Sequence, residues 1–153
     1  MNKPRAQRNQ TITLTSEERD MLRKQIAYAD AWEPTRWENA IVCAPLLEVI
    51  DRVPDGVADL IIIDPPYNLA KDFGGLSFSA ISSDKYIAYL HTWFDKVCDK
   101  LKPTGTLYMC GDWKCTAALQ TVIEERLTIL NRITWQREKG RGARANWKNG
   151  MED

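Results

Sequence analysis

The stretch Val57–Leu69, with the sequence VADLIIIDPPYNL, contains the strongest structural signal in the chain. Its first part, Val57–Ile63, is an almost continuous apolar run rich in β-branched residues. Such a run is typical of a central parallel strand that is buried on both faces. The apolar run ends abruptly at Asp64, and two prolines follow it. We therefore expect a buried strand over Val57–Ile63 that ends in a rigid turn.

Helices and strands alternate on both sides of this strand. Upstream, an amphipathic helix is expected to begin at Ser16, to run through Ile26 and Ala27 and to end before Pro34. A strand over Ala40–Cys43 and a helix over Pro45–Arg52 are expected after it. Downstream we expect a loop over Lys71–Ser83, a helix over Asp84–Leu101, a strand over Thr106–Cys110, a helix over Thr116–Arg126 and a β-rich segment over Leu127–Trp135. This order predicts an α/β fold with a doubly wound parallel sheet and a βαβ crossover.

The length and composition of the chain predict one ordinary domain, and its cysteines and apolar segments indicate the cellular compartment. The 153 residues are 44% hydrophobic, and 21 basic residues balance 21 acidic ones, so net charge neither favours nor excludes a nucleic-acid partner. The four cysteines lack the spacing of a disulfide framework, and a single histidine leaves a zinc site short of ligands, so no metal is expected. No stretch is apolar enough for a membrane span or a signal peptide. We expect a cytoplasmic protein.

The residues after the apolar strand, Asp64-Pro65-Pro66-Tyr67-Asn68, carry the most specific chemistry. Open α/β sheets bind ligands at the carboxyl ends of their strands, where this motif stands. The prolines fix the backbone and remove two donors, leaving the Asp64 carboxylate and the Pro65 carbonyl as acceptors, and Tyr67 can stack on a heterocycle. Together they indicate a clamp for the amine of a nucleobase. The alternative is a turn that only caps the strand.

A basic segment near the end of the sequence is a candidate nucleic-acid contact. Between Arg132 and Lys148, six positive charges face one negative charge, and Trp135 and Trp147 are interleaved with them. The alternative is a solvated basic surface. Gly140–Ala145 matches G-x-G-x-x-A, but its arginines suit a phosphate-contacting loop better than a dinucleotide fingerprint. The expected DNA-binding residues are Arg137, Lys139, Arg141, Arg144 and Lys148.

The motif and its surroundings resemble the β-class DNA amino-methyltransferases. The resemblance runs from about Asn39 to the end of the chain and includes Asp64–Tyr67, Asn68 and Leu69, the segments Val57–Ile61 and Leu101–Tyr108, and Trp93 and Trp135. It implies a Rossmann-like sheet that uses S-adenosylmethionine, with Asp64, Pro65, Pro66 and Tyr67 as the catalytic residues. Aspartate at the first motif position is typical of N6-adenine enzymes, and serine is typical of N4-cytosine enzymes. The implied reaction is methylation of adenine N6 in DNA.

The same resemblance implies an incomplete cofactor site. Asp64, Leu69, Cys43 and Ala44 are the expected cofactor contacts, although many relatives carry a Gly-Asp pair where this chain has Cys43-Ala44. In the β-class order the glycine-rich cofactor motif comes last, and no such motif is found before Asp153. We therefore expect the N-terminal half of a split or truncated enzyme that lacks the strands around the glycine motif. The apolar strand would then be a sheet edge, covered by a second subunit in a hetero-oligomer.

These expectations divide the chain into a polar arm (1–15), a partial catalytic domain (16–135) and a basic segment leading into a target-recognition region (136–153). The host would be a bacterial, archaeal or phage-infected cell, and the setting restriction–modification. Three alternatives stay open. One is N4-cytosine methylation. Another is methylation of RNA or of a protein glutamine, although those families more often begin the tetrapeptide with asparagine. The third is a catalytically inactive relic or a DNA-binding subunit.

Overall fold

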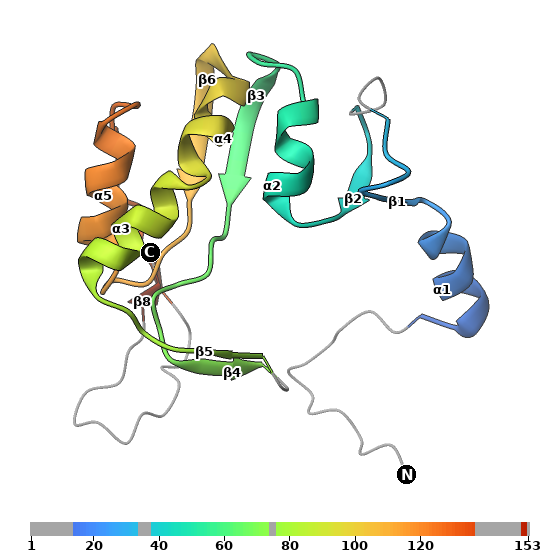
Figure 1. The fold of residues 1–153 in the computed structure, drawn as a ribbon, viewed down its shortest axis with the longest axis horizontal. Coiled ribbons are helices and arrows are strands. Elements are labelled where there is room, and N and C mark those ends of the chain that lie inside the picture. The colour runs from blue at the N-terminus through green and yellow to red at the C-terminus, as the bar shows by residue number, and fades with distance from the viewer. Residues whose placement is uncertain (1–13, 34–37, 74–75, 137–150, 153) are drawn as a thin grey trace. The chain divides into compact units, whose positions relative to one another are not determined.

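The computed structural model describes residues 14–33, 38–73, 76–136 and 151–152. The chain divides into two compact units, Met1–Arg52 and Val53–Asp153. Figure 1 shows the helices and strands of both units along the chain. The predicted domain boundaries at residues 15 and 135 stay predictions. Among the described residues, no helix has the length and apolar character needed to cross a membrane.

The first unit begins with helix α1 (Ser16–Arg23), whose start at Ser16 is confirmed. A capping box stabilises this start, because the Thr15 amide donates to Glu18 Oε2 at 2.9 Å and the Glu18 amide donates to Thr15 Oγ1 at 3.2 Å. The helix ends at Arg23, before Pro34 as expected, but the expected helical run through Ile26 and Ala27 is wrong. The next residues instead form strand β1 (Ile26–Tyr28), whose backbone pairs in parallel with β2 (Ile41–Cys43). Helix α2 (Leu46–Val49) and the 3-10 turn η2 (Ile50–Arg52) follow.

The second unit is built on two parallel strands, β3 (Ala58–Ile63) and β6 (Leu101–Met109). Helices α3 (Ser83–His91) and α4 (Phe94–Lys100) lie between them in sequence, and α5 (Thr116–Glu124) follows β6. The expected βαβ connection between parallel strands is thus confirmed, and the fold is mixed α/β. The Rossmann-like detail of the sheet stays a prediction.

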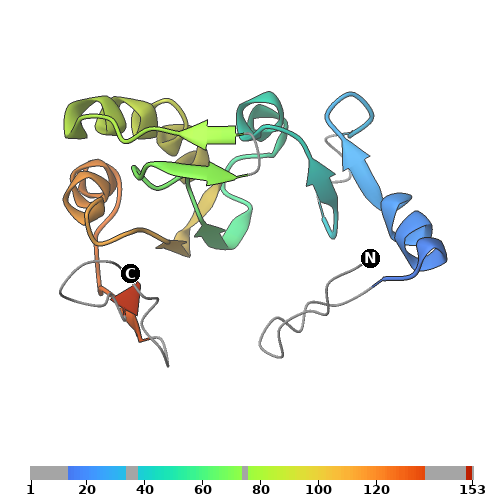
Figure 2. The same cartoon turned by 90° about the horizontal axis from the view of Figure 1, so that it is seen from below.

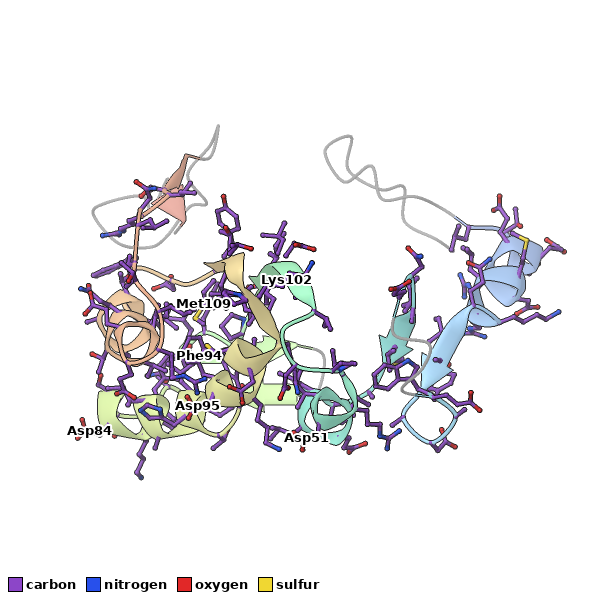
Figure 3. The ribbon with its side chains drawn as sticks, turned by 90° about the horizontal axis from the view of Figure 1, so that it is seen from above. Asp51, Asp84, Phe94, Asp95, Lys102 and Met109 are labelled. Carbon is purple, nitrogen blue, oxygen red and sulfur yellow. The ribbon has the colours of Figure 1, made fainter. Side chains whose placement is uncertain are left out.

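The core of the second unit lies where α3, α4 and α5 meet (Figures 1 and 2). Phe94, Leu90 and Val122 are its largest fully buried side chains, and Figure 3 shows Phe94 in the interior between the helices and β6. Gly111, just after β6, permits the close approach of α5, since a Cβ there would lie 2.5 Å from Leu119 Cδ1. This packing holds the carboxyl end of β6 next to α5.

Strand β3 is buried on one face only, so the expectation of burial on both faces is wrong. Its residues alternate, with Ile61 and Ile63 partly buried, whereas Leu60 and Ile62 are 52% and 67% exposed. In the paired strand, Tyr108 lies opposite Ile62 and is 47% exposed. An apolar run fits a doubly covered strand, but among the described residues the other face is left open. Within the described residues, β6 is also the only strand paired with β3.

Three further expectations differ from the structure. The helix expected over Asp84–Leu101 breaks at Thr92 and Trp93, where Thr92 Oγ1 donates to the Tyr89 carbonyl at 2.6 Å and Trp93 leaves the helical conformation. The expected loop after Ala70 contains an antiparallel hairpin, β4 (Lys71–Phe73) and β5 (Leu76–Phe78). The β-rich stretch 127–134 forms no strand, and only β7 (Trp135–Gln136) pairs, with β8 (Met151–Glu152).

Candidate active site

The Asp64–Tyr67 turn leaves the sheet at the carboxyl end of β3. The Cys110 amide donates to the Ile63 carbonyl at 2.8 Å, so β3 and β6 stay paired up to the residue before the turn. Asp64 is exposed, Pro65 is buried and Tyr67 is half-buried. The turn therefore presents a carboxylate to solvent from a backbone that is anchored on the sheet.

Asp64 and Tyr67 interact with each other through their side chains. The Tyr67 hydroxyl is hydrogen-bonded to the Asp64 carboxylate. Desolvation raises the pKa of Tyr67 well above its ordinary value, and the hydrogen bond with Asp64 and the negative charge of that carboxylate raise it further. The phenol therefore stays neutral at any working pH and remains a donor to Asp64. A carboxylate has further lone pairs, so this bond leaves Asp64 able to accept a second donor.

Tyr86, on α3, holds the second proline of the turn. Its hydroxyl donates to the Pro66 carbonyl at 3.1 Å, and only 3% of the residue is exposed. Burial raises the pKa of Tyr86 to about 12, with smaller contributions from Cys115 and Tyr89. No described residue donates to the carbonyl of Pro65. Of the two proline carbonyls, the one predicted to bind substrate is thus the one without an internal donor among the described residues.

Asn68 joins the turn to two other parts of the second unit. Its Nδ2 donates to the Ile81 carbonyl at 2.7 Å, and the Ile81 amide donates to Asn68 Oδ1 at 2.7 Å. Its own amide donates to Cys115 Sγ at 3.3 Å. Because residues 69–80 contain the β4–β5 hairpin, the paired bonds to Ile81 close that segment at its base.

The sequence did not single out Tyr86, Cys110, Asp112 or Cys115 as neighbours of the motif. Burial raises the pKa of Cys110, and the negative charge of Asp64 raises it further. Asp112 contributes to the raised pKa of Tyr67. These residues come from α3 and from the segment between β6 and α5. The only available signal was their position after a strand parallel to β3, because the carboxyl ends of parallel strands meet at one edge.

The other predicted site residues are distributed over both units. Leu69 is half-buried, and its amide donates to the Tyr67 carbonyl at 2.7 Å. Cys43, exposed, and Ala44, half-buried, belong to the first unit, whereas Asp64 belongs to the second. Arg137, Lys139, Arg141, Arg144 and Lys148 lie outside the described residues. In the described part of the chain, no group of three or more histidine, cysteine or acidic side chains could hold a metal ion.

Comparison with known sequences identifies the family. The profile of the family described as DNA methylase, which covers N6 and N4 methyltransferases, matches residues 58–152. The chain belongs to this DNA methylase family. The matched region of the methylase chain includes the Asp64–Tyr67 turn, Tyr86 and the segment between β6 and α5. The resemblance to DNA amino-methyltransferases is thereby confirmed at the level of the family.

Three similar proteins carry names that describe methyltransferases. Type II methyltransferase M.HpaI of Haemophilus parainfluenzae is 30% identical over 107 residues, which are 69% of this chain and 34% of that protein. Type II methyltransferase M1.MboII of Moraxella bovis is 32% identical over 69% of the chain and 40% of its own length. DNA adenine methyltransferase YhdJ of Escherichia coli K12 is 31% identical over 67% and 36%. The matched part of the chain thus spans little more than a third of these relatives.

Proposed function

We propose that the methylase chain takes part in transferring a methyl group from S-adenosylmethionine to N6 of adenine in DNA. The observation that carries the proposal is the exposed Asp64 carboxylate at the end of β3, beside a Pro65 carbonyl that no described residue occupies. Family membership supports methyl transfer, and the name of the YhdJ relative supports adenine as the target.

In this proposal, adenine is flipped out of the duplex so that its amine reaches the turn. The amine offers two N–H donors, which match the Asp64 carboxylate and the Pro65 carbonyl, and the ring of Tyr67 stacks on the base. A conjugated amine is a poor nucleophile. Drawing its protons toward two acceptors shifts the nitrogen toward sp³ character and directs its lone pair. The bond between Tyr67 and Asp64 holds the carboxylate in place while the amine binds.

S-adenosylmethionine would supply the electrophilic methyl group. On this chain we assign Asp64 and Leu69 of the second unit as contacts to it, and the assignment of Cys43 and Ala44 stays a prediction. Asp64 offers an exposed carboxylate and Leu69 a half-buried apolar side chain, which suit the charged and the apolar parts of such a ligand. The part of the site that a glycine-rich motif would form belongs, in our proposal, to a different polypeptide segment.

We further propose that this segment is a second subunit that covers β3. The exposed Leu60, Ile62 and Tyr108 form an apolar face on the two paired strands. Hydrophobic faces and strand edges of this kind aggregate unless another element covers them. Strands of the second subunit that carry the glycine motif could pair with the edge of β3 that faces away from β6. They would cover this edge and complete the cofactor site at the same time.

The test is transfer of labelled methyl from S-adenosylmethionine to adenine-containing DNA, with the chain alone and with a candidate partner. Asp64→Ala should abolish transfer. Asp59→Ala is a matched control, because Asp59 is an exposed acidic residue on β3, the strand that precedes Asp64. Its carboxylate forms an ion pair with Lys102 Nζ at 2.7 Å. Transfer only in the mixture, lost in Asp64→Ala but not in Asp59→Ala, supports the proposal, and the product should be N6-methyladenine. Inactivity with the partner demonstrably bound would contradict catalysis and leave a DNA-binding role. Activity of the chain alone would contradict the need for a partner.

A further inference from the structure

The short segment between β6 and α5, Gly111–Cys115, lies at the same sheet edge as the proposed catalytic turn. Hydrogen bonds to Ile63 and Asn68, the residues on either side of that turn, hold this segment at both of its ends. Before it, the Cys110 amide donates to the Ile63 carbonyl at 2.8 Å, and at its end Cys115 Sγ accepts from the Asn68 amide at 3.3 Å. Four residues lie between Cys110 and Cys115, and two of them, Trp113 and Lys114, are exposed, as Asp64 is, where the chain leaves the carboxyl ends of the paired strands.

The backbone of this segment is held in a defined turn. The Lys114 amide donates to Asp112 Oδ1 at 3.0 Å, and the Cys115 amide donates to the Asp112 carbonyl at 2.8 Å. The turn nevertheless leaves its largest side chain in solvent, since Trp113 is 58% exposed. Lys114 is also exposed, and its Nζ lies 5.7 Å from the centre of the Trp113 ring. A hydrogen-bonded turn thus presents a large, partly exposed aromatic ring with a cation over the ring.

We propose that Trp113 and Lys114 form a nucleic-acid contact, in which the Trp113 ring stacks on a base next to the target nucleotide and Lys114 contacts a neighbouring phosphate. This inference rests on the proposed function of the Asp64 turn. A flipped nucleotide stays covalently joined to its neighbours, and enzymes that act on bases contact those flanking nucleotides. The Cα of Trp113 lies within about 11 Å of the Cα of Cys110, because Trp113 is three positions further along the chain. The flanking nucleotides are within reach at that distance.

The charges in the turn indicate which interaction dominates. Lys114 is positive and Asp112 is negative, so the turn has little net attraction for a phosphate backbone. An aromatic ring stacks on any base because every base has a π-face. Stacking by Trp113 therefore supplies most of the affinity of this turn for DNA, and Lys114 adds a single salt-sensitive contact.

The experiment measures the affinity of the methylase chain, with its partner subunit if one is required, for fluorescein-labelled adenine-containing DNA by fluorescence anisotropy. Trp113→Ala should weaken binding about 5- to 100-fold, the effect of losing one stacked base. Trp113→Phe should recover most of the affinity, because it keeps a ring. Lys114→Gln should reduce the dependence of log affinity on log salt by about one. Lys102→Gln is the control, because Lys102 lies at the opposite end of β6.

Methyl transfer and circular dichroism are measured on the same samples. Wild-type affinity in folded Trp113→Ala would overturn the inference even if methyl transfer is intact, and so would equal losses in Trp113→Ala and Lys102→Gln. Weakened binding in Trp113→Ala, recovered in Trp113→Phe, would support the inference even if the wild-type chain transfers no methyl group. That last result would count against the proposed function alone.

Discussion

Replacing Asn68 by alanine should open the segment 69–80 without unfolding the second unit. The change removes two hydrogen bonds, both 2.7 Å long, that join the Asn68 side chain to the backbone of Ile81. Each such bond contributes about 0.5–1.5 kcal/mol, and the low half of this range applies because Ile81 is 43% exposed and water can replace the lost partner. A total of about 1–2 kcal/mol corresponds to a roughly 5- to 30-fold shift toward the open segment.

Amide hydrogen exchange measures this shift directly, because the Ile81 amide donates to the Asn68 side chain. Its protection should fall roughly 5- to 30-fold in Asn68→Ala, whereas the amide of Val122 in α5 should keep its protection. Asn68→Asp should have an intermediate effect, because it keeps the acceptor but loses the donor. Gln120→Ala is the control for loss of a side-chain amide. Its Nε2 donates to Glu124 Oε1 at 2.9 Å within α5. Unchanged exchange at Ile81, or an equal loss at Val122, would refute the reasoning.

Three further predictions concern packing, ionisation and exposure. Gly105→Ala should lower the free energy of unfolding in urea by about 1–3 kcal/mol, because the new Cβ would lie 2.9 Å from the Ala58 backbone oxygen. Gly111→Ala should lower it less, since only the Leu119 side chain must move. Equal losses in the two variants would contradict this reasoning. Tyr86 should ionise at about pH 12, monitored by absorbance at 295 nm against Tyr86→Phe. Because folding favours the neutral phenol, its contribution to stability is complete below pH 10 and is lost as the pH rises to about 12; ionisation at pH 10 in the folded state would contradict burial. Ile62→Ser should change the free energy of unfolding by less than about 0.5 kcal/mol and reduce self-association in sedimentation, because Ile62 is 67% exposed; a large destabilisation would show that this face is covered.

Local signals in the sequence predicted where several elements begin and end. The start of α1 at Ser16 is confirmed, because acidic residues in a first turn stabilise a helix wherever it lies. The end of β3 at Ile63 is also confirmed, since an aspartate and two prolines stop a strand by their own chemistry. These features depend on neighbouring residues only and can be read without the rest of the fold.

Features that depend on distant residues could not be predicted in the same way. The apolar run of β3 does not reveal which face other elements cover, so the exposure of Leu60 and Ile62 was not foreseen. The helix ending at Arg23 was predicted too long, because Ile26–Tyr28 fit either a helix or a strand and pairing with β2 decides between them. The contacts of Tyr86 and Cys115 with the turn arise only after α3 and α5 have packed.

The geometry of the candidate site therefore depends on the packing of helices that lie outside the Asp64–Tyr67 turn. The two prolines fix the local path of the turn, but they do not decide which of their carbonyls receives a donor from the described residues. That choice follows from Tyr86, whose hydroxyl donates to the Pro66 carbonyl from α3, while Cys115, just before α5, accepts from the Asn68 amide. Because α3 and α5 pack on each other, the free energy of their contact also holds the acceptors in place. Substitutions at this helix interface should thus weaken the proposed methyl transfer before they unfold the chain.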